Sequence, residues 1–495
     1  MAEVELKFEL PPEAHAQFRR LAALDASEPK STRLLALYFD TARHDLARRE
    51  MAMRLRRSGR GWKQALKAGA SGSGGLHARK EWEYDRPDAS IDLSLFESTP
   101  LASLPRAKKL HESLAEVFRV EVARTTWRVE LAPGTSVEVA LDRGVVRRGK
   151  RTETISEVEI ESLEGAPLAV FDLAERIVER VALRPSAVTK AQRGYRLASG
   201  EKAAPAKARD VEMDGAMAPG DGARAAIASA LRQLQENEAG VIDTRDPGFV
   251  HQMRIALRRL RSALRAFRKA TGPDLEARVR DDLHWITQAT GKARDLDVLA
   301  TQTLPAMLAA YSGGDTRSLA RRLAVRRRQA RDDVRCALAS PRYARLVLVF
   351  ARWLASPQAD APGPGASLRE FADRALGQRH ARWVRAAQGV ERMAPADRHR
   401  VRIGAKRLRY VADGFASLYR KKRVAGYREA LSKLQDDLGR ANDAAVAERL
   451  LGELAAPAPF AAFARGWLAS ETRASLAGLA RDVRRIDRAM PWEKD

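Results

Sequence analysis

Carboxylate side chains recur at every second position near the start of this 495-residue sequence and again near residue 160. The first run contains Glu3 and Glu5, and the second contains Glu157, Glu159 and Glu161. Side chains two residues apart lie on the same face of a β-strand. Carboxylates held side by side repel one another unless a hard divalent cation lies between them, and Mg²⁺ and Mn²⁺ prefer oxygen ligands. The spacing therefore indicates divalent-cation chemistry.

Basic side chains show the same spacing in other segments. They are Lys7, Arg54, Arg56, Lys63, Lys67 and Arg79. A solvated outer face of a sheet would explain any single run. Their repetition, and their segregation by sign, instead favour a sheet whose charged faces turn inward and form a tunnel. Such a tunnel would bind a metal-chelated polyphosphate, because Arg and Lys bind phosphate oxygens and stabilise charge that develops at a transferred phosphorus.

These residues lie in motifs that resemble the CYTH superfamily, the triphosphate tunnel metalloenzymes. Glu3-x-Glu5-x-Lys7 is the signature of that family, and further elements follow in family order through residue 198. They are Arg54-x-Arg56, Gln64 to Lys67, Arg79-x-Glu81-x-Glu83, Phe118-Arg119 with Arg124 and Trp127, Glu138 with Asp142 to Gly144, Glu157-x-Glu159-x-Glu161, and Ser186 with Lys190 and Arg193 to Tyr195. Where the family often has Thr-Leu-Lys, this chain has Ala65-Leu66-Lys67, which keeps the lysine.

The resemblance implies an eight-stranded antiparallel β-barrel that hydrolyses a triphosphate with Mg²⁺ or Mn²⁺. The metal ligands that it implies are Glu3, Glu5, Glu159 and Glu161, with Glu157 nearby. The substrate ligands that it implies are Lys7, Arg54, Arg56, Lys67, Arg79, Arg124 and Lys190. We assign the catalytic roles to Glu3, Glu5 and Lys7, and leave open which group activates water.

No Ser–His or Cys–His arrangement in the sequence indicates a covalent intermediate, so we expect direct in-line attack of water on a terminal phosphorus. Inorganic triphosphate is the predicted substrate, because it needs only phosphate ligands and the sequence reveals no organic pocket. Two alternatives remain. One is a catalytically inactive protein that binds polyphosphate and is thereby targeted to polyphosphate granules. The other is an enzyme for an organic triphosphate, either a thiamine triphosphatase or an adenylyl cyclase.

The second half of the chain contains an internal repeat with an offset of 148 residues. His251 and Arg254 of the first copy match His399 and Arg402 of the second. On a helix, the first copy separates into an apolar seam and an adjacent basic row, and residues 249–270 include no acidic residue. A solvated helix face usually mixes charges at i,i+4 spacing. The row therefore favours a bound polyanion.

Residues 223–495 resemble the CHAD domain, a helical module with a characteristic histidine that accompanies CYTH domains and binds inorganic polyphosphate. The resemblance rests on His251-Gln252-Met253-Arg254, on Arg294 to Asp297, and on the second copy of the basic row. The predicted polyphosphate-binding residues are His251, Arg254, Arg258, Arg261, Arg265, His399, Arg402, Lys406 and Arg409. Asp295, Asp297 and Asp443 are expected to pair with the arginines of these motifs, with a catalytic role as the less favoured alternative. Metal binding by the histidines is left open.

Nucleic acid is not the expected partner of the basic rows. The rows lack interleaved aromatic side chains, and the sequence contains no helix-turn-helix, zinc-finger or RNA-binding signature. Inorganic triphosphate and inorganic polyphosphate are the predicted partners. The sequence leaves the oligomeric state open.

The elements that must position these residues divide the chain into two parts. Residues 1–198 alternate with period two and predict an α+β domain, a β-barrel tunnel with flanking helices. Residues 199–222 are small, polar and rich in Pro and Gly, and predict a linker. Residues 223–495 carry the helical period and predict an all-α domain of duplicated helical bundles. The net charge of +25 divides at Gly200 into about +5 and about +20, so most of it belongs to the helical part.

The sequence also indicates where the protein works. The N-terminal residues alternate in charge where a signal peptide needs an apolar run, and no later stretch is long and apolar enough for a transmembrane span. The single cysteine, Cys336, excludes an intramolecular disulfide. We expect a cytoplasmic protein without a membrane segment. Association with polyphosphate granules is left open.

Overall fold

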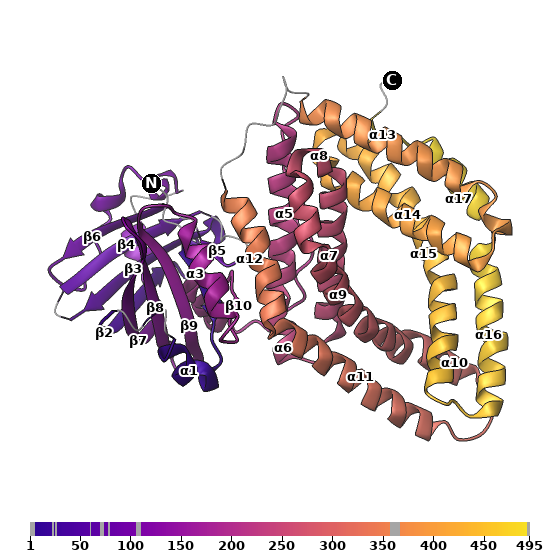
Figure 1. Ribbon diagram of the computed structural model, residues 1–495, viewed down its shortest axis with the longest axis horizontal. Coiled ribbons are helices and arrows are strands. Elements are labelled where there is room, and N and C mark those ends of the chain that lie inside the picture. The colour runs from indigo at the N-terminus through magenta and orange to yellow at the C-terminus, as the bar shows by residue number, and fades with distance from the viewer. Residues whose placement is uncertain are drawn as a thin grey trace. The chain divides into compact units, whose positions relative to one another are not determined.

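A computed structural model describes most of the chain, which divides into two units (Figure 1). The described residues are 5–21, 24, 27–59, 61–69, 74–77, 80–104, 110–356 and 367–492. Two predicted site residues, Glu3 and Arg79, lie outside these ranges. We call residues 1–204 with 338–356 the sheet unit, and residues 205–337 with 357–495 the helical unit.

The strands of the sheet unit form one antiparallel sheet. Within the described residues it has ten strands in the order β10-β1-β9-β8-β7-β2-β3-β4-β6, with β5 paired to β1. Their bounds are β1 Glu5–Glu9, β2 Lys30–Asp40, β3 Met51–Ser58, β4 Gly61–Ala68, β5 Leu76–His77, β6 Lys80–Arg86, β7 Ala115–Ala132, β8 Thr135–Arg148, β9 Arg151–Glu164 and β10 Arg184–Pro185. The α+β class that the sequence predicts is confirmed.

The expected closed, eight-stranded barrel is wrong. Among the described strands, β6 pairs only with β4, and no ladder joins it to β1. The reason is that β5 and β10 already occupy the edge of β1, where Leu6 lies opposite Leu76 and Phe8 opposite Pro185. The backbone groups that a closing strand would need are therefore already bonded.

The two faces of the sheet differ in character. Leu6, Phe8, Val139, Val158 and Ile160 are completely buried on one face, where they join an apolar cluster with α3 (Ala169–Val178). The strand residues between them turn to the opposite face and carry the charges described below, because successive side chains alternate across a strand. Helices α4 (Lys190–Ser199) and α12 (Pro341–Ala355) also belong to the sheet unit.

Residues 200–218, most of the predicted linker, contain no helix or strand. From Pro205 on they belong to the helical unit. The Ala206 N–H donates to Asn237 Oδ1 (3.0 Å), and the Met213 N–H donates to Ser417 Oγ (2.9 Å). The side chain of Met213 is buried. This stretch is therefore packed along the helical unit.

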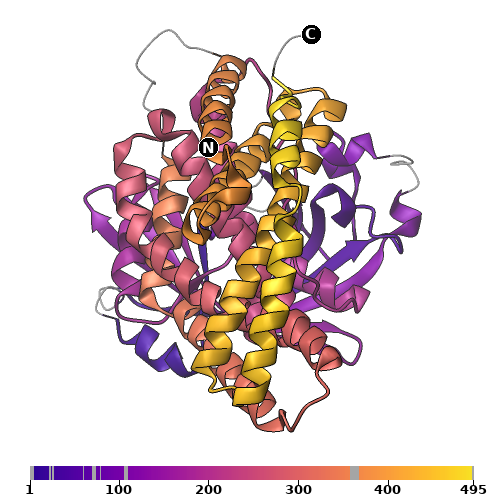
Figure 2. The same ribbon diagram turned by 90° about the vertical axis from the view of Figure 1, so that its right-hand side faces the viewer.

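The helical unit repeats its elements with the offset that the sequence predicts. Its main helices are α5 Pro219–Glu236, α6 Glu238–Asp243, α7 Pro247–Ala266, α9 Pro273–Val298, α10 Leu304–Ala310, α11 Arg317–Leu338, α13 Leu368–Ala387, α14 Pro395–Gly414, α15 Lys421–Glu453, α16 Ala458–Leu476 and α17 Leu479–Asp487. Both ends of α14 fall 148 residues after those of α7, and α15 begins 148 residues after α9. The long helices α15 and α16 lie side by side (Figure 2).

A helix that crosses a membrane needs about 20 consecutive, mostly apolar residues. In the part of the chain that the structure describes, no helix is both long enough and apolar enough to cross a membrane.

Candidate functional site

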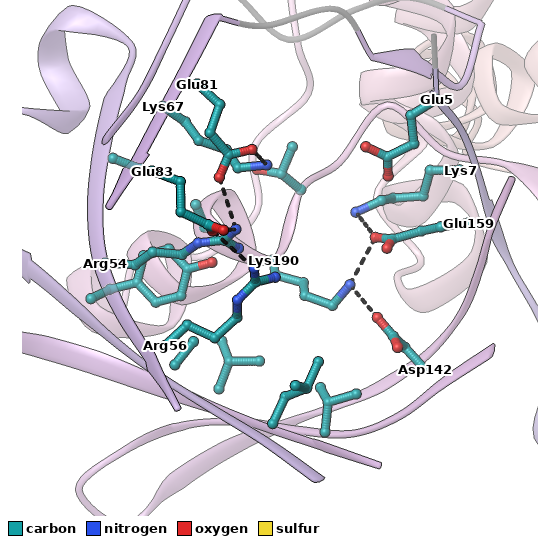
Figure 3. Close-up of a pocket in the computed structure, with 18 of the residues that line it drawn as sticks. Glu5, Lys7, Arg54, Arg56, Lys67, Glu81, Glu83, Asp142, Glu159 and Lys190 are labelled. Atoms are coloured by element: carbon teal, nitrogen blue, oxygen red, sulfur yellow. Dashed lines mark hydrogen bonds and ion pairs between the residues drawn. The ribbon is translucent and has the colours of Figure 1, made fainter. Parts of the chain in front are cut away.

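The charged face of the sheet surrounds a cavity of about 1070 Å³ (Figure 3). Strands β1, β3, β4, β6, β7, β8 and β9 and the start of α4 contribute charged side chains to its lining. These charges form two groups on opposite sides of the cavity in Figure 3. We describe each group in turn, starting with the one on β3, β4 and β6.

The first group pairs basic residues of β3 and β4 with acidic residues of β6. Arg54 Nη2 donates to Glu81 Oε1 (3.0 Å), and Arg56 Nη2 donates to Glu83 Oε2 (2.8 Å). Lys67 Nζ lies 2.7 Å from Glu81 Oε2. The register explains these pairs, because Lys67 lies directly opposite Glu81 in the β4–β6 ladder. The two signs that we expected on separate strands are thus neutralised in pairs within one side of the cavity.

The second group centres on Glu159 of β9. Lys7 Nζ and Lys190 Nζ each lie 2.9 Å from Glu159 Oε1, and Arg124 also contacts this carboxylate. The register places Lys7 directly opposite Glu159. Lys190 is the first residue of α4, whose N-terminus is fixed by a capping box: Thr189 Oγ1 accepts from the Gln192 N–H (3.2 Å) while Gln192 Oε1 accepts from the Thr189 N–H (2.9 Å).

Asp142 of β8 extends the second group. Arg124 forms a bidentate interaction with it, in which Nε donates to Oδ1 and Nη2 donates to Oδ2, each at 2.7 Å. Lys190 Nζ lies 2.7 Å from Asp142 Oδ2. Glu157, which lies opposite Asp142 in the ladder, is completely buried behind them and contacts Lys190. One arginine and two lysines therefore share three carboxylates.

These contacts shift the pKa values of the group in opposite directions. Burial alone would raise the pKa of Glu159, but Lys190, Lys7 and Arg124 hold it well below its usual value. Burial alone would lower the pKa of Lys7, but the charges of Glu157 and Glu159 outweigh it and raise the pKa. Glu5 differs, because burial and the neighbouring charge of Glu159 raise its pKa.

Among the residues that the structure describes, the carboxylates of the second group form a cluster able to hold a metal ion. Asp142, Glu157 and Glu159 each offer an oxygen, and these oxygens lie within 4.8 Å of one another. Glu157 Oε2 is buried, and no described residue hydrogen-bonds to it. A buried carboxylate oxygen without a donor is unusual and suits a cation ligand. Glu5 and Glu161 line the same cavity.

The structure brings most of the residues predicted for the tunnel together. Lys7, Glu5, Arg54, Arg56, Lys67, Arg124, Glu159, Glu161 and Lys190 line the cavity. Glu157 lies in the metal-ligand group behind the lining. Four further carboxylates line it, Glu81, Glu83, Glu138 and Asp142, which the sequence analysis placed in family motifs but to which it assigned no role. Their period-two or period-four spacing on strands was the available signal.

Part of the cavity wall is apolar. Leu34 and Ala36 of β2, Ala52 of β3, and Val120 and Val122 of β7 line it. Tyr38 also lines the cavity and stacks on Phe118, with ring centroids 4.6 Å apart. The sequence analysis did not predict an apolar surface beside the charges.

In the helical unit, the two basic rows of the repeat meet. Helices α7 and α14 pack together, and Arg258 of α7 acts electrostatically on both Arg402 and Lys406 of α14. His251 and Arg254 belong to the same set. We call His251, Arg254, Arg258, Arg402 and Lys406 the cation cluster.

The cation cluster lowers the pKa of its own members. Burial and then the charge of Arg258 lower the pKa of Lys406 to about 6 and that of Arg254 to about 10. Burial and the charge of Arg294 lower that of His251 to about 4. Asp295 and Asp443 are acidic groups that act on the cluster, and among the described residues one ion pair links them to it, between Arg402 Nη2 and Asp443 Oδ1 at 3.8 Å. Positive charge is therefore in excess here.

The other residues predicted for the helical site lie outside this cluster. Arg261 and Arg265 act on one another and on Arg407. His399 is exposed, and its Nδ1 lies 2.9 Å from Asn442 Oδ1. Arg409 Nη1 donates to Ser432 Oγ (3.1 Å), and its guanidinium lies over the Tyr410 ring. Asp297 pairs with Arg327 and Arg331 of α11.

Comparisons with known proteins match both units. The CYTH domain model matches residues 1–195, and the CHAD domain model matches residues 225–452. An inorganic triphosphatase of Haemophilus influenzae is 29% identical over 202 residues, which are 40% of this chain and 56% of that protein. The matched segment thus spans little more than half of that relative.

Other relatives match more of the chain. An uncharacterized protein of Mycobacterium tuberculosis is 28% identical over 440 residues, 83% of this chain and 82% of that protein. A crystal structure of the CHAD domain from the plant Ricinus communis is 34% identical, with a TM-score of 0.49, over 59% of this chain and 99% of that chain.

Proposed function

Because this chain belongs to the CYTH and CHAD families, with a CYTH domain at residues 1–195 and a CHAD domain at residues 225–452, we propose that it is an inorganic triphosphatase that also binds inorganic polyphosphate. The sheet unit hydrolyses triphosphate to diphosphate and phosphate. The helical unit holds phosphate chains. The likeness to an inorganic triphosphatase supports the first assignment.

One observation carries the enzymatic proposal. In a single cavity, carboxylates able to hold a divalent cation face a set of phosphate-binding cations. A triphosphate chelated by a metal presents both charges at once, so it complements both sides of this cavity. A substrate with only negative charge would leave the carboxylates of the second group facing it.

The residues present fit Mg²⁺ or Mn²⁺. Asp142, Glu157 and Glu159 would hold the cation, with Glu5 and Glu161 on the same lining. All are hard oxygen ligands, which these two ions prefer. When bound, such a cation supplies Lewis-acid polarisation of the phosphate oxygens.

The cations of the chain bind and orient the phosphate chain. Arg54, Arg56 and Lys67 on one side, and Lys7, Arg124 and Lys190 on the other, offer N–H donors to phosphate oxygens. Donors on both sides would hold the chain extended and place its terminal phosphorus for in-line attack by water. The same donors would neutralise the charge that develops on the leaving diphosphate.

Phosphate release from triphosphate by the full-length protein with Mn²⁺ or Mg²⁺ tests this function. We expect Glu5→Gln to lower kcat by at least about a hundredfold, since it removes a carboxylate that lines the cavity. Glu130→Gln is the matched control, because Glu130 lies on β7 but is exposed. Absence of phosphate release by the wild type, or equal activity of both variants, would refute the proposal.

The apolar wall favours a second candidate, an organic triphosphate. Leu34, Ala36 and Val122 offer a surface that inorganic triphosphate would leave uncovered. A substrate panel of triphosphate, thiamine triphosphate and ATP, with detection of phosphate and of cyclic AMP, separates the two. A higher kcat/KM for an organic substrate would replace our first choice.

The cation cluster supports the polyphosphate assignment for the helical unit. Its cationic side chains lie close together and, among the described residues, outnumber the carboxylates that pair with them. A bound polyanion would therefore relieve their mutual repulsion. Retention of the protein on immobilised polyphosphate, with easy displacement from DNA by moderate salt, is the expected result. Equal affinity for both polymers would contradict it. Association with polyphosphate granules in cells would follow from the same binding.

A further inference from the structure

One helix from the second half of the sequence packs into the core of the sheet unit. Ala344, Leu348 and Ala351 of α12 recur at four- and three-residue spacing and are essentially unexposed. They belong to the same apolar cluster as Phe171 of α3 and Phe8 of β1. Helix α12 contacts both α3 and β10, and Figure 1 shows it beside them. Its apolar stripe is therefore covered by the sheet unit.

Charges along the edge of this contact are complementary. Helix α3 and the residue after it present Asp172, Glu175 and Glu179 at helical spacing. Arg352 Nη1 lies 2.6 Å from Asp172 Oδ1 and 3.7 Å from Glu175 Oε1. Arg345 Nη1 lies 3.6 Å from Glu179 Oε1. An apolar surface with an acidic edge fits a basic amphipathic helix, and α12 has that chemistry.

The elements beneath α12 hold the strand that carries Glu5 and Lys7. Strand β10 pairs with β1, and the Ser186 N–H donates to the Lys7 carbonyl oxygen (2.8 Å). Leu6 and Phe8, the neighbours of Lys7, pack in the cluster to which Leu348 belongs. The main chain of Lys7 is thus fixed from behind by residues that α12 helps to cover.

We propose that the surface formed by α3 and β10 is a docking site for α12 of the same chain, and that α12 seated there is a positioning element for β1. The CYTH family model ends at residue 195, so it does not include this helix, which lies within the range matched by the CHAD model. The cavity of the sheet unit consequently depends on a segment of the other family's domain. The activity readout below rests on the proposed triphosphatase function, whereas the exchange readout does not.

A pair of leucine substitutions in the full-length protein tests this dependence. Leu348→Ala opens a cavity under α12, and Leu434→Ala, a completely buried leucine of α15, is the matched control in the helical unit. We expect hydrogen exchange of the amides at residues 5–9, at Arg184 and at Ser186 to accelerate about tenfold or more in Leu348→Ala and to stay within twofold of wild type in Leu434→Ala. The kcat for triphosphate should fall more than KM rises, because Glu5 and Lys7 shift relative to bound substrate.

A charge exchange provides a second, milder test. Arg352→Asp places two carboxylates together at the edge of α12, and adding Asp172→Arg restores an opposite pair. We expect faster exchange at residues 5–9 in the single variant and recovery in the double variant. Equal exchange at β1 in Leu348→Ala and Leu434→Ala, or no recovery in the double variant, would overturn the proposal. A wild type without triphosphatase activity would refute the proposed function alone, because the exchange experiment would still decide the role of α12.

Discussion

Both the sheet unit and the helical unit bring arginine and lysine side chains close together, but the neighbours of these cations differ. In the sheet unit they are carboxylates, and in the helical unit they are mainly other cations. In the cavity, Lys7 and Lys190 contact buried carboxylates, and their pKa values are raised. In the cation cluster, burial and then the charges of neighbouring cations lower the pKa values of Arg254 and Lys406 to about 10 and about 6. The pKa values of the same residue types are therefore shifted in opposite directions in the two units.

This difference indicates what each site is prepared to bind. A cavity whose charges are already paired gains little from a lone anion, because that anion must compete with Glu159 and Asp142 for the cations. It gains most from a ligand that brings both signs, such as a metal-chelated triphosphate. A cluster with uncompensated positive charge gains directly from a polyanion. Net charge alone could not separate these two cases.

The largest effect that we predict is for Glu159→Gln. The change leaves Lys7, Lys190 and Arg124 without a shared carboxylate, so we expect the free energy of unfolding to fall by about 3–5 kcal/mol. Urea denaturation measures it. Triphosphate hydrolysis should also fall by at least about a hundredfold, because a proposed metal ligand is lost.

Glu164→Gln is the control for this substitution. Glu164 ends β9, is exposed, and pairs with the exposed Arg128 (3.0 Å). Exposed pairs contribute about 0–1 kcal/mol, so the unfolding free energy should hardly change. Similar losses of unfolding free energy in both variants would show that the ion pairs of the cavity contribute no more to stability than an exposed ion pair.

A second prediction concerns the opposite kind of site. We expect Arg254→Ala combined with Arg402→Ala to weaken polyphosphate binding about a hundredfold, roughly 2.7 kcal/mol, because two charged hydrogen-bond donors are lost. Titration calorimetry at fixed salt measures it. Since the change also removes like-charge repulsion, stability should stay equal or rise. A loss of triphosphate turnover in this variant would contradict our separation of the two functions.

The sequence predicted the parts of both sites that depend on local period. Alternation on β1 and β9 placed Lys7 and Glu159 on one face, and the 148-residue repeat predicted the correspondence of α7 and α14. It could not predict which strands pair across long separations. The contact of Arg54 with Glu81, the occupied edge of β1, and the packing of α12 on α3 depend on that tertiary arrangement.

Our third prediction is a pH dependence of polyphosphate binding. A bound polyanion would restore the pKa of Lys406 from about 6 toward its ordinary value, so the complex would hold more protons than the free protein above pH 6. Affinity should therefore rise as pH falls from about 9 to about 6, by at most about tenfold per unit, and level off below. The groups known to act on Lys406 are His251, Arg254, Arg258, Arg402 and Asp443.

Calorimetry in buffers of different ionisation enthalpy measures the proton uptake. Lys406→Arg keeps the charge but does not titrate in this range, so it should bind with a flat pH profile. The titration of His251, with a pKa of about 4, lies below the window and does not obscure it. An unchanged slope in Lys406→Arg would assign the proton uptake to another group.

The free energy of unfolding should depend on pH in the opposite direction. Between pH 6 and about 10.5 the unfolded chain holds a proton on Lys406 that the folded protein has lost, so the free protein should become more stable as pH rises through that range.

The smallest predicted effect separates two residues that the repeat treats as equivalent, Arg261 and Arg409. Arg261 faces Arg258 and Arg265 without an acidic group among the charges that shift its pKa, whereas Arg409 is held by Ser432 and lies over Tyr410. We expect Arg261→Ala to weaken polyphosphate binding a few-fold and to flatten the dependence of log K on log salt by about 0.7–0.9, the loss of one phosphate contact. Arg409→Ala should change neither by more than the error of the measurement. Equal effects would mean that the anion follows the symmetry of the sequence repeat and not the asymmetric cluster in which the repeat has folded.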